Sequence, residues 1–110
     1  FENEIDFSKI RVIGGGAKGK TWRKIMADIY NKEVLKPAIL EEATSLGAAI
    51  AGGVGVGIFS GVEVAEELNP IIERESPEPK NVEKYKKLYP VFKDTYSSLT
   101  EVYDRLSEID

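Results

Sequence analysis

A glycine-rich turn between an apolar strand pattern and a helical pattern constrains the fold of this chain more than any other feature. The stretch RVIGGGAKGKTW, residues 11–22, passes from β-branched residues through three successive glycines to the start of the helical pattern. β-Branched residues favour strands, and glycine allows the backbone the positive φ angles of a tight turn. This order predicts the first half of a βαβ unit.

The second half of the unit follows directly along the chain. The first strand is expected over residues 9–13, and a second short strand over EVLKP, residues 33–37. Two strands joined by a crossover helix pair in parallel, with a right-handed connection. The chain is therefore expected to be an α/β protein with two parallel strands and several helices.

The helix between these strands has one apolar face. Apolar residues recur there at spacings of three and four: Trp22, Ile25, Met26, Ile29 and Tyr30. Arg23, Lys24 and Asp28 are expected on the opposite face, and Asn31 is expected to end the helix.

A second helix is expected from Glu41 to about Gly57, and its many small residues distinguish it. Each glycine destabilises a helix interior by roughly 1 kcal/mol relative to alanine, so the pattern favours close packing against another backbone over ligand contact. Its apolar run from Leu46 to Phe59 has 14 residues, whereas a membrane span needs about 20. We interpret the run as a buried helix and expect no membrane association.

The C-terminal part is expected to be peripheral. A short helix is predicted over residues 62–68, and the polar stretch 73–81 is interpreted as an extended surface connector. The last helical pattern covers residues 82–106, kinked or divided at Pro90. Its stripe of aromatic residues and leucines is expected to face the core: Tyr85, Leu88, Tyr89, Phe92, Tyr96, Leu99, Tyr103 and Leu106.

Composition excludes several kinds of function. The 110 residues have the size of one domain, and the net charge of −4 argues against nucleic-acid binding. The sequence has no Cys and no His, so it offers no disulfide, no thiolate nucleophile and no imidazole base. Any chemistry must use carboxylates, lysines, backbone amides or a partner. A cytoplasmic location fits this composition.

The glycine turn has the features of a phosphate site. The first N–H groups of a helix lack intrahelical partners, and glycine lets a ligand approach the backbone closely. Four cations crowd the first turn of the helix: Lys18, Lys20, Arg23 and Lys24. Positive charge is unfavourable at this end of a helix unless an anion docks there. The residues alone leave anion binding and a tight turn with solvated lysines equally open.

The same stretch matches the P-loop pattern G-x-x-x-x-G-K-T through Gly14, Gly19, Lys20 and Thr21. A P-loop NTPase also needs a second apolar strand that ends in a magnesium-binding Asp. The strand EVLKP ends in Pro37 instead. A P-loop, or another phosphate-binding module without catalysis, is therefore the alternative rather than the leading interpretation. A helical scaffold that binds nothing is a third.

The combined motifs resemble the C-terminal part of FGGY-type carbohydrate kinases, with the xylulose kinase-like branch as the closest match. The resemblance rests on GGGA at 14–17, Trp22, and the Ala27-Asp28 pair, followed by the EVLKP strand. It continues through EEATSLGAA at 41–49 and YKKLYPVFKDTYSSL at 85–99. It covers nearly the whole chain, about residues 9–107.

The resemblance implies an actin-like, ribonuclease H-like ATPase fold and transfer of the ATP γ-phosphoryl group to a sugar hydroxyl, with xylulose giving xylulose 5-phosphate. The chain would be the C-terminal portion of the second domain, with a βαβα core at about 9–58 and peripheral helices at 59–110. By position, the residues expected to contact ATP are Gly14, Gly15, Gly16 and Ala17, with Lys18 and Lys20 as further candidates.

The resemblance also places part of the machinery outside this chain. The catalytic base, the magnesium-binding acids and the sugar-binding residues of the family lie upstream, so no catalytic or metal-binding residue is expected here. Asp28 is expected to make a structural hydrogen bond, and Glu41 and Glu42 to cap the second helix. The chain begins with Phe, and we expect it to be an inactive piece whose partner is the remaining kinase chain. Alone it should be marginally stable or self-associate, for example as a homodimer.

Overall fold

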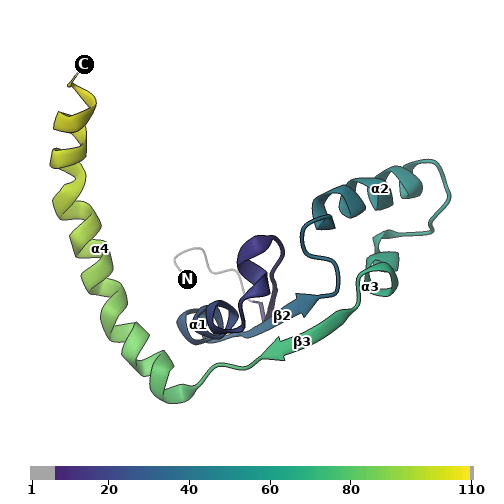
Figure 1. The fold of residues 1–110 in the computed structure, drawn as a ribbon, viewed down its shortest axis with the longest axis horizontal. Helices are drawn as coiled ribbons and strands as arrows, with labels where there is room; N and C mark the ends of the chain where they lie inside the picture. Colours follow the sequence, from purple (N-terminus) through teal and green to yellow (C-terminus); the bar gives the residue numbers. More distant parts are fainter. Residues whose placement is uncertain (1–6, 110) are drawn as a thin grey trace.

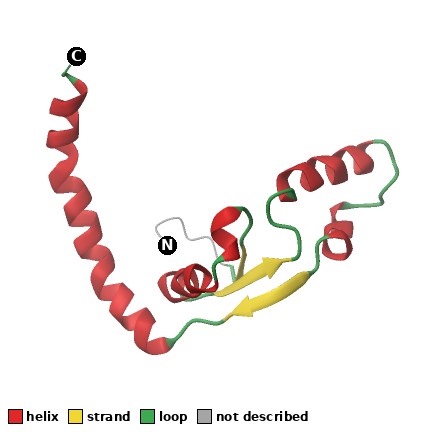
Figure 2. Cartoon of the chain, viewed as in Figure 1, coloured by secondary structure: helices red, strands yellow, loops and turns green. Residues whose placement is uncertain are grey.

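A computed structural model describes residues 7–109, which form a mixed three-stranded sheet with helices around it (Figures 1 and 2). The elements in chain order are β1 (Lys9–Arg11), the 3₁₀ turn η1 (Gly15–Lys18), α1 (Lys20–Tyr30), β2 (Glu33–Pro37), α2 (Ala43–Gly55), the 3₁₀ turn η2 (Val62–Val64), α3 (Ala65–Leu68), β3 (Ile71–Glu75) and α4 (Pro79–Ser107).

The predicted βαβ unit is confirmed. Strands β1 and β2 pair in parallel, with Ile10 opposite Val34, and α1 connects them. Strand β2 has the predicted bounds, whereas β1 is two residues shorter than predicted. Helix α1 ends at Asn31 in the left-handed conformation, with φ 50° and ψ 43°, a geometry that asparagine tolerates better than most residues.

The sheet has a third strand that the sequence interpretation missed. Strand β3 pairs antiparallel with β2, so the order is β1-β2-β3 and the sheet is mixed. Residues 73–75 were predicted to be a surface connector because they are all charged. They form a strand because their side chains find partners: Glu73 pairs with Lys36 and Arg23, and Arg74 pairs with Glu33.

The core is a small cluster between α1 and the sheet. It contains Val12, Ala17, Ala27, Val34 and Leu40. On α1 the prediction of the buried face was wrong, because the structure buries Arg23 to 1% exposure and Asp28 to 2%, while Trp22 stays 55% exposed. The two charged residues are buried because each has several hydrogen-bond partners on other elements.

The small residues of α2 do not pack as predicted. Gly47, Gly52 and Gly55 have no neighbouring atom within 4 Å of an added Cβ, and of this helix only Ile50 is buried. Gly53 is the exception, because the ring of Phe59 folds back against it and would lie 2.5 Å from such a Cβ. The other described residues therefore cover little of this helix.

Helix α4 is one continuous helix that leads away from the sheet (Figure 1). A second helix starting at Pro90 was therefore the wrong alternative. Pro90 is tolerated because Lys86, whose carbonyl loses its partner, is exposed to water. The aromatic stripe was predicted to be core, but Phe92 is 67% and Tyr96 66% exposed, since no other described element covers it.

The described residues are extended rather than compact. Their radius of gyration is 18.8 Å, compared with about 13 Å for a compact domain of this length. None of the helices in the described part of the chain is both long and apolar enough to cross a membrane.

Candidate functional site

The glycine corner, defined as residues 14–19, joins β1 to α1. Gly14 has φ 81°, a left-handed region that favours glycine. Its N–H donates to Leu40 O at 2.9 Å, and Val12 N–H donates to Leu35 O at 3.0 Å. The corner is thus attached to β2 and to the segment that follows it. These bonds fix where the chain leaves the sheet.

Two sets of backbone N–H groups at the corner precede the first hydrogen-bonded N–H of a helix. The first N–H that bonds within η1 is that of Ala17, to Gly14 O at 3.1 Å, so the N–H groups of Gly15 and Gly16 precede the bonded ones. Likewise, Arg23 N–H to Gly19 O is the first bond of α1, so the N–H groups of residues 20–22 precede it.

The corner is open to a ligand. Gly15 and Gly16 are exposed, and an added Cβ at Gly15 would have no atom within 4 Å. At Gly16 the ring of Trp22 lies at 3.5 Å, an ordinary contact. An anionic acceptor can therefore come close to the backbone at this point. Ala17, in contrast, is buried at 3% exposure and forms the inner side of the corner.

The four cations predicted to crowd the corner have different roles. Lys18 pairs with Glu41 at 2.8 Å, and Lys24 donates to Ser76 O at 2.6 Å. Lys20 is exposed and has no hydrogen bond or ion pair to the residues that the structure describes. Lys20 is therefore the cation best placed to meet an incoming anion.

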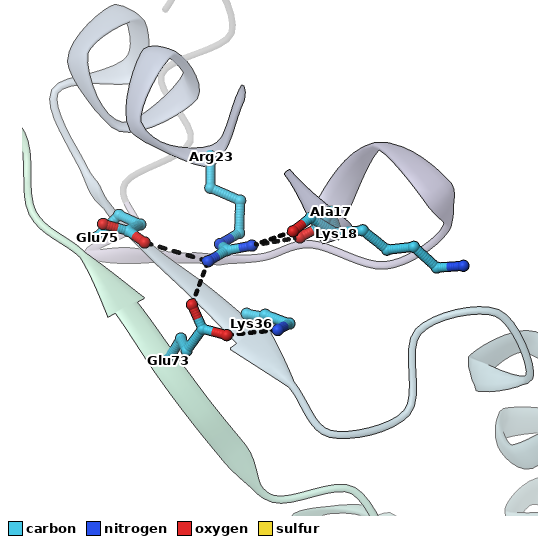
Figure 3. Close-up of polar contacts among 6 residues, drawn as sticks. All are labelled: Ala17, Lys18, Arg23, Lys36, Glu73 and Glu75. Carbon is cyan, nitrogen blue, oxygen red and sulfur yellow. Dashed lines mark hydrogen bonds and ion pairs between the residues drawn. The ribbon is translucent and has the colours of Figure 1, made fainter. Parts of the chain in front are cut away.

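Arg23 is buried and faces inward, so it is neither solvated nor placed to meet an anion, the two possibilities that the sequence left open for the cations at the corner. Figure 3 shows its guanidinium between the corner and β3. Nη1 donates to Ala17 O at 2.7 Å and to Lys18 O at 3.0 Å. Nη2 donates to Glu73 and, at 3.2 Å, to Glu75. Nε has no hydrogen-bond partner among the described residues.

Glu73 connects α1 to β2 in this network. It accepts hydrogen bonds from Arg23 and from Lys36 of β2 (Figure 3). The pKa of Glu73 is lowered, first by the hydrogen bond from Lys36 and then by the charges of Arg23, Lys36 and Lys20, which together exceed the opposing effect of burial. The carboxylates beneath the corner are thus matched by cations, so they do not present unbalanced negative charge to it.

Asp28 connects α1 to the start of α4. It accepts hydrogen bonds from Glu78 N–H at 2.6 Å and from Asn81 Nδ2 at 2.8 Å. Burial acts to raise the pKa of Asp28, but these two hydrogen bonds and the charge of Lys24 outweigh burial, so the pKa lies below its ordinary value. The predicted structural hydrogen bond of Asp28 is confirmed.

The predicted position of Glu42 at the start of α2 is confirmed, but neither predicted cap forms a side-chain hydrogen bond to the helix. Glu42 stands at the N-cap position but makes no side-chain hydrogen bond to the helix. Glu41 pairs instead with Lys18 across the corner, with about half of each side chain exposed. This pair is solvated and contributes little to stability, although it brings the N-terminal end of α2 close to the corner.

A groove of about 380 Å³ runs beside the corner, between α1 and the first turns of α4. Three lysines and one carboxylate are among the residues that line it. The full lining consists of Lys20, Thr21, Lys24, Ile25, Asp28, Asn81, Lys84 and Tyr85. In the described part of the chain, no group of three or more His, Cys, Asp or Glu residues is arranged to hold a metal ion.

The sequence of the chain is similar to those of known carbohydrate kinases. The model of the FGGY family of carbohydrate kinases, C-terminal domain, matches residues 1–56, half of the chain. The chain is 44% identical over 86 residues to an autoinducer-2 kinase of Escherichia coli strain K12, covering 73% of the chain and 16% of that protein. It is 29% identical over 106 residues to a xylulose kinase of Lactococcus lactis, covering 94% of the chain and 21% of that protein.

Two solved structures share the arrangement of the elements. A xylulose kinase from Lactobacillus acidophilus matches with a TM-score of 0.83 at 20% identity, over 96% of this chain and 21% of that one. A xylulose kinase from Rhodospirillum rubrum matches with a TM-score of 0.70 at 26% identity, over 88% of this chain and 20% of that one. The predicted fold, part of an actin-like ATPase domain, is confirmed, with a third, antiparallel strand added to the two parallel strands.

The chain spans about a fifth of the length of these relatives. The match includes the corner, α1, both parallel strands and all of α2, on which most of the resemblance was based, whereas the tail at 85–99 lies outside the matched residues. The G-x-x-x-x-G-K-T pattern therefore lies within a sequence that a sugar-kinase family accounts for. The chain belongs to the FGGY family of carbohydrate kinases and carries sequence of its C-terminal domain.

Proposed function

We propose that this chain is the nucleotide-contacting segment of a sugar kinase that transfers the γ-phosphoryl group of ATP to a sugar hydroxyl. The observation that carries the proposal is the open glycine corner, in which Gly15 and Gly16 are exposed and their N–H groups precede the first bonded N–H of η1. Backbone N–H groups at helix starts are suited to phosphate oxygens. Family membership supports ATP as the phosphoryl donor.

The residues of the corner fit the predicted contacts with ATP. Gly14 provides the left-handed turn, and Gly15 and Gly16 provide the open backbone. Ala17 is buried on the inner side of the corner. Lys20 offers an exposed positive charge, and Lys18 forms an ion pair with Glu41. Bound ATP would supply the transferred phosphoryl group, and these residues would bind and orient it.

The remaining chemistry is proposed to come from residues outside this chain. Phosphoryl transfer needs a base that accepts the sugar proton and acids that hold Mg²⁺. We assign neither role to a residue here and expect the chain alone to be inactive. Its proposed place is the C-terminal portion of the second kinase domain, with the βαβα core at about 9–58 and a segment at 59–110 that adds β3 to the sheet and otherwise carries peripheral helices.

The exposed stripe of α4 supports the remainder of the kinase chain as partner. Apolar residues return at intervals of seven, at Tyr85, Phe92, Leu99 and Leu106, the spacing of a helix that packs along its length against another helix. A xylulose kinase about five times longer has the same extended arrangement. We therefore propose that the other four-fifths of such a kinase cover this stripe.

The proposed sugar is xylulose, which would give xylulose 5-phosphate. The xylulose kinase match covers 94% of the chain. Autoinducer-2 is the second candidate, because the autoinducer-2 kinases are more similar, at 44% identity for the Escherichia coli protein and 37% over 106 residues for that of Yersinia enterocolitica. The sugar-binding residues are expected outside this chain, so similarity within it does not decide the sugar.

A direct assay tests the function. The full-length kinase that contains this chain is purified and incubated with MgATP and either D-xylulose or autoinducer-2, and ADP release is followed. The proposal expects ADP release that depends on the sugar, with D-xylulose preferred. Preference for autoinducer-2 selects the second candidate, and no ADP release with any sugar contradicts a kinase role.

A further inference from the structure

We propose that Arg23 is a positioning residue for nucleotide binding. Its guanidinium holds the glycine corner in the shape that a nucleotide meets, and Glu73 and Glu75 of β3 hold the guanidinium in place. The inference rests on the proposed function, because it requires that the corner bind a nucleotide. It adds a strand about 50 residues away to the nucleotide site.

The corner has little side-chain packing that could hold its shape. Four of its six residues are glycines, and an added Cβ at Gly14 or Gly15 would touch nothing within 4 Å. Glycine has the greatest backbone freedom in the unfolded chain, so ordering such a segment is entropically unfavourable. Of the residues of η1 only Ala17 is buried. Beyond the backbone hydrogen bonds of Gly14 and Ala17, further hydrogen bonds from outside the corner would help to order it.

Arg23 provides such hydrogen bonds through its nitrogen Nη1. Nη1 donates to the carbonyls of Ala17 and Lys18, at the C-terminal end of η1, where carbonyl groups lack partners within the turn. A cation is also electrostatically favourable at that end. Because Arg23 stands in the first turn of α1, these bonds connect η1 to α1, the two elements whose first N–H groups precede the bonded ones.

The acids of β3 hold the guanidinium in place by accepting hydrogen bonds from Nη2. Successive residues of a strand point to opposite faces, so Glu73 and Glu75 share one face, where both contact Nη2. Without these acids a cation that is 1% exposed would be buried unpaired, which is strongly unfavourable. The planar fork of arginine can serve both sides at once, whereas a lysine offers a single point of charge.

The contrast between Arg23 and Lys20 supports the assignment. Lys20 is exposed and can reach a ligand directly, whereas Arg23 is covered and points its donors at backbone carbonyls and carboxylates. Arg23 thus acts on a nucleotide only through the corner. Its effect should appear in nucleotide affinity and leave sugar affinity unchanged.

The test uses the full-length kinase with three single variants. Arg23→Lys keeps the charge but removes the fork, and Glu75→Gln keeps the shape of the acid but removes its charge. Arg74→Met is the control, because Arg74 lies between the two acids on the opposite face, half-exposed, and pairs only with Glu33 among the described residues. KM is measured separately for ATP and for the sugar, with the melting temperature of each variant.

We expect Arg23→Lys to raise KM for ATP by roughly tenfold or more, since charge-assisted hydrogen bonds are lost, with KM for the sugar within about twofold of wild type. Glu75→Gln should change KM for ATP in the same direction by a smaller factor, and Arg74→Met should leave it unchanged. If Arg23→Lys does not fold, Glu75→Gln decides alone.

Lower melting temperatures with an unchanged KM for ATP would show that Arg23 only stabilises the fold, and would overturn the proposal. Equal changes in KM for ATP and sugar would overturn it as well. Failure of the wild-type kinase to bind ATP at all is a different result, because it contradicts the proposed function and the positioning role together.

Discussion

Asp28 on α1 and Asn81 on α4 are 53 positions apart in the sequence and are joined by a hydrogen bond of 2.8 Å. The same carboxylate accepts the N–H of Glu78, which stands at the N-cap position of α4. Two contacts from one buried side chain thus set the point at which the long helix leaves the sheet.

Asp28→Ala should therefore loosen the start of α4. The variant removes two hydrogen bonds to a buried carboxylate, a loss of roughly 1–3 kcal/mol of local stability. Amide hydrogen exchange of residues 78–82 in the full-length kinase should become faster by about tenfold or more, while Asp94→Ala, an exposed change on the same helix, should have no effect. Unchanged exchange in Asp28→Ala would show that other contacts hold the helix.

The same carboxylate predicts an acid-sensitive link. The pKa of Asp28 in the folded chain lies below its ordinary value of 3.8, so the unfolded chain binds the proton more readily. The stability that ionised Asp28 contributes is then fully present above pH 3.8 and is lost as the pH falls through the lower folded-state pKa. Exchange of residues 78–82, corrected for intrinsic rates, should rise on acidification below pH 4, and Asp28→Asn should flatten this rise. An equal rise in both proteins would assign it to other groups.

Phe92 tests the role of the exposed stripe. If the remainder of the kinase covers α4, Phe92→Ser in the full-length protein should lower its unfolding free energy by about 3 kcal/mol or more, as for other buried aromatic residues. Ser97→Ala, on the exposed helix at a position outside the stripe, is the control. In the isolated chain the stripe is free to self-associate, so sedimentation at low and high concentration should show association that Phe92→Ser weakens. Full stability of the full-length variant would mean that the stripe stays uncovered.

Lys20 separates the proposed site from a P-loop. A P-loop lysine contacts the transferred phosphates directly, and its removal abolishes turnover. In the proposed site Lys20 adds one exposed charge to a backbone site, so Lys20→Ala should reduce kcat/KM for ATP by less than about tenfold. The assay is steady-state ADP release by the full-length kinase, with Lys84→Ala, from the same groove, as the matched control. Complete loss of activity in Lys20→Ala alone would favour the P-loop interpretation.

The βαβ unit could be predicted from the sequence because local physics determines it. β-Branched residues next to glycines define β1 and the corner, and the run EVLKP defines β2 to the residue. Asn31 ends α1 because its own conformational preference allows the left-handed geometry. None of these features needs a distant partner.

Strand β3 and the burial of Arg23 could not be predicted in the same way. A charged run such as Glu73-Arg74-Glu75 is typical of a solvated segment, and it becomes a strand only when cations on α1 and β2 lie opposite it. These partners are separated by 37 to 52 positions, beyond the range of any helical or strand spacing. The signal that was present, two isoleucines at 71 and 72 ahead of the charges, favours a strand but is short.

The stripe of α4 and the glycines of α2 were wrongly predicted to be buried, and the reason is a different one. Their apolar and small residues follow helical spacing, which predicts a buried face but does not say which chain covers it. The structure leaves Phe92 67% exposed and places no described atom within 4 Å of a Cβ added at Gly52. Such faces are understandable in a chain that spans a fifth of its relatives.

ATP affinity of the full-length kinase with Gly15→Val tests the central claim most directly. The added side chain meets no protein atom within 4 Å of its Cβ and needs no positive φ, so the fold should tolerate it, yet it would occupy the space in front of the exposed N–H groups. Gly52→Val, an equally open glycine on α2, is the matched control. By isothermal titration calorimetry we expect Kd for ATP to rise by more than a hundredfold in Gly15→Val, equivalent to about 3 kcal/mol, and to stay at the wild-type value in Gly52→Val. Wild-type ATP affinity in a folded Gly15→Val kinase would contradict the assignment of the corner as the nucleotide site.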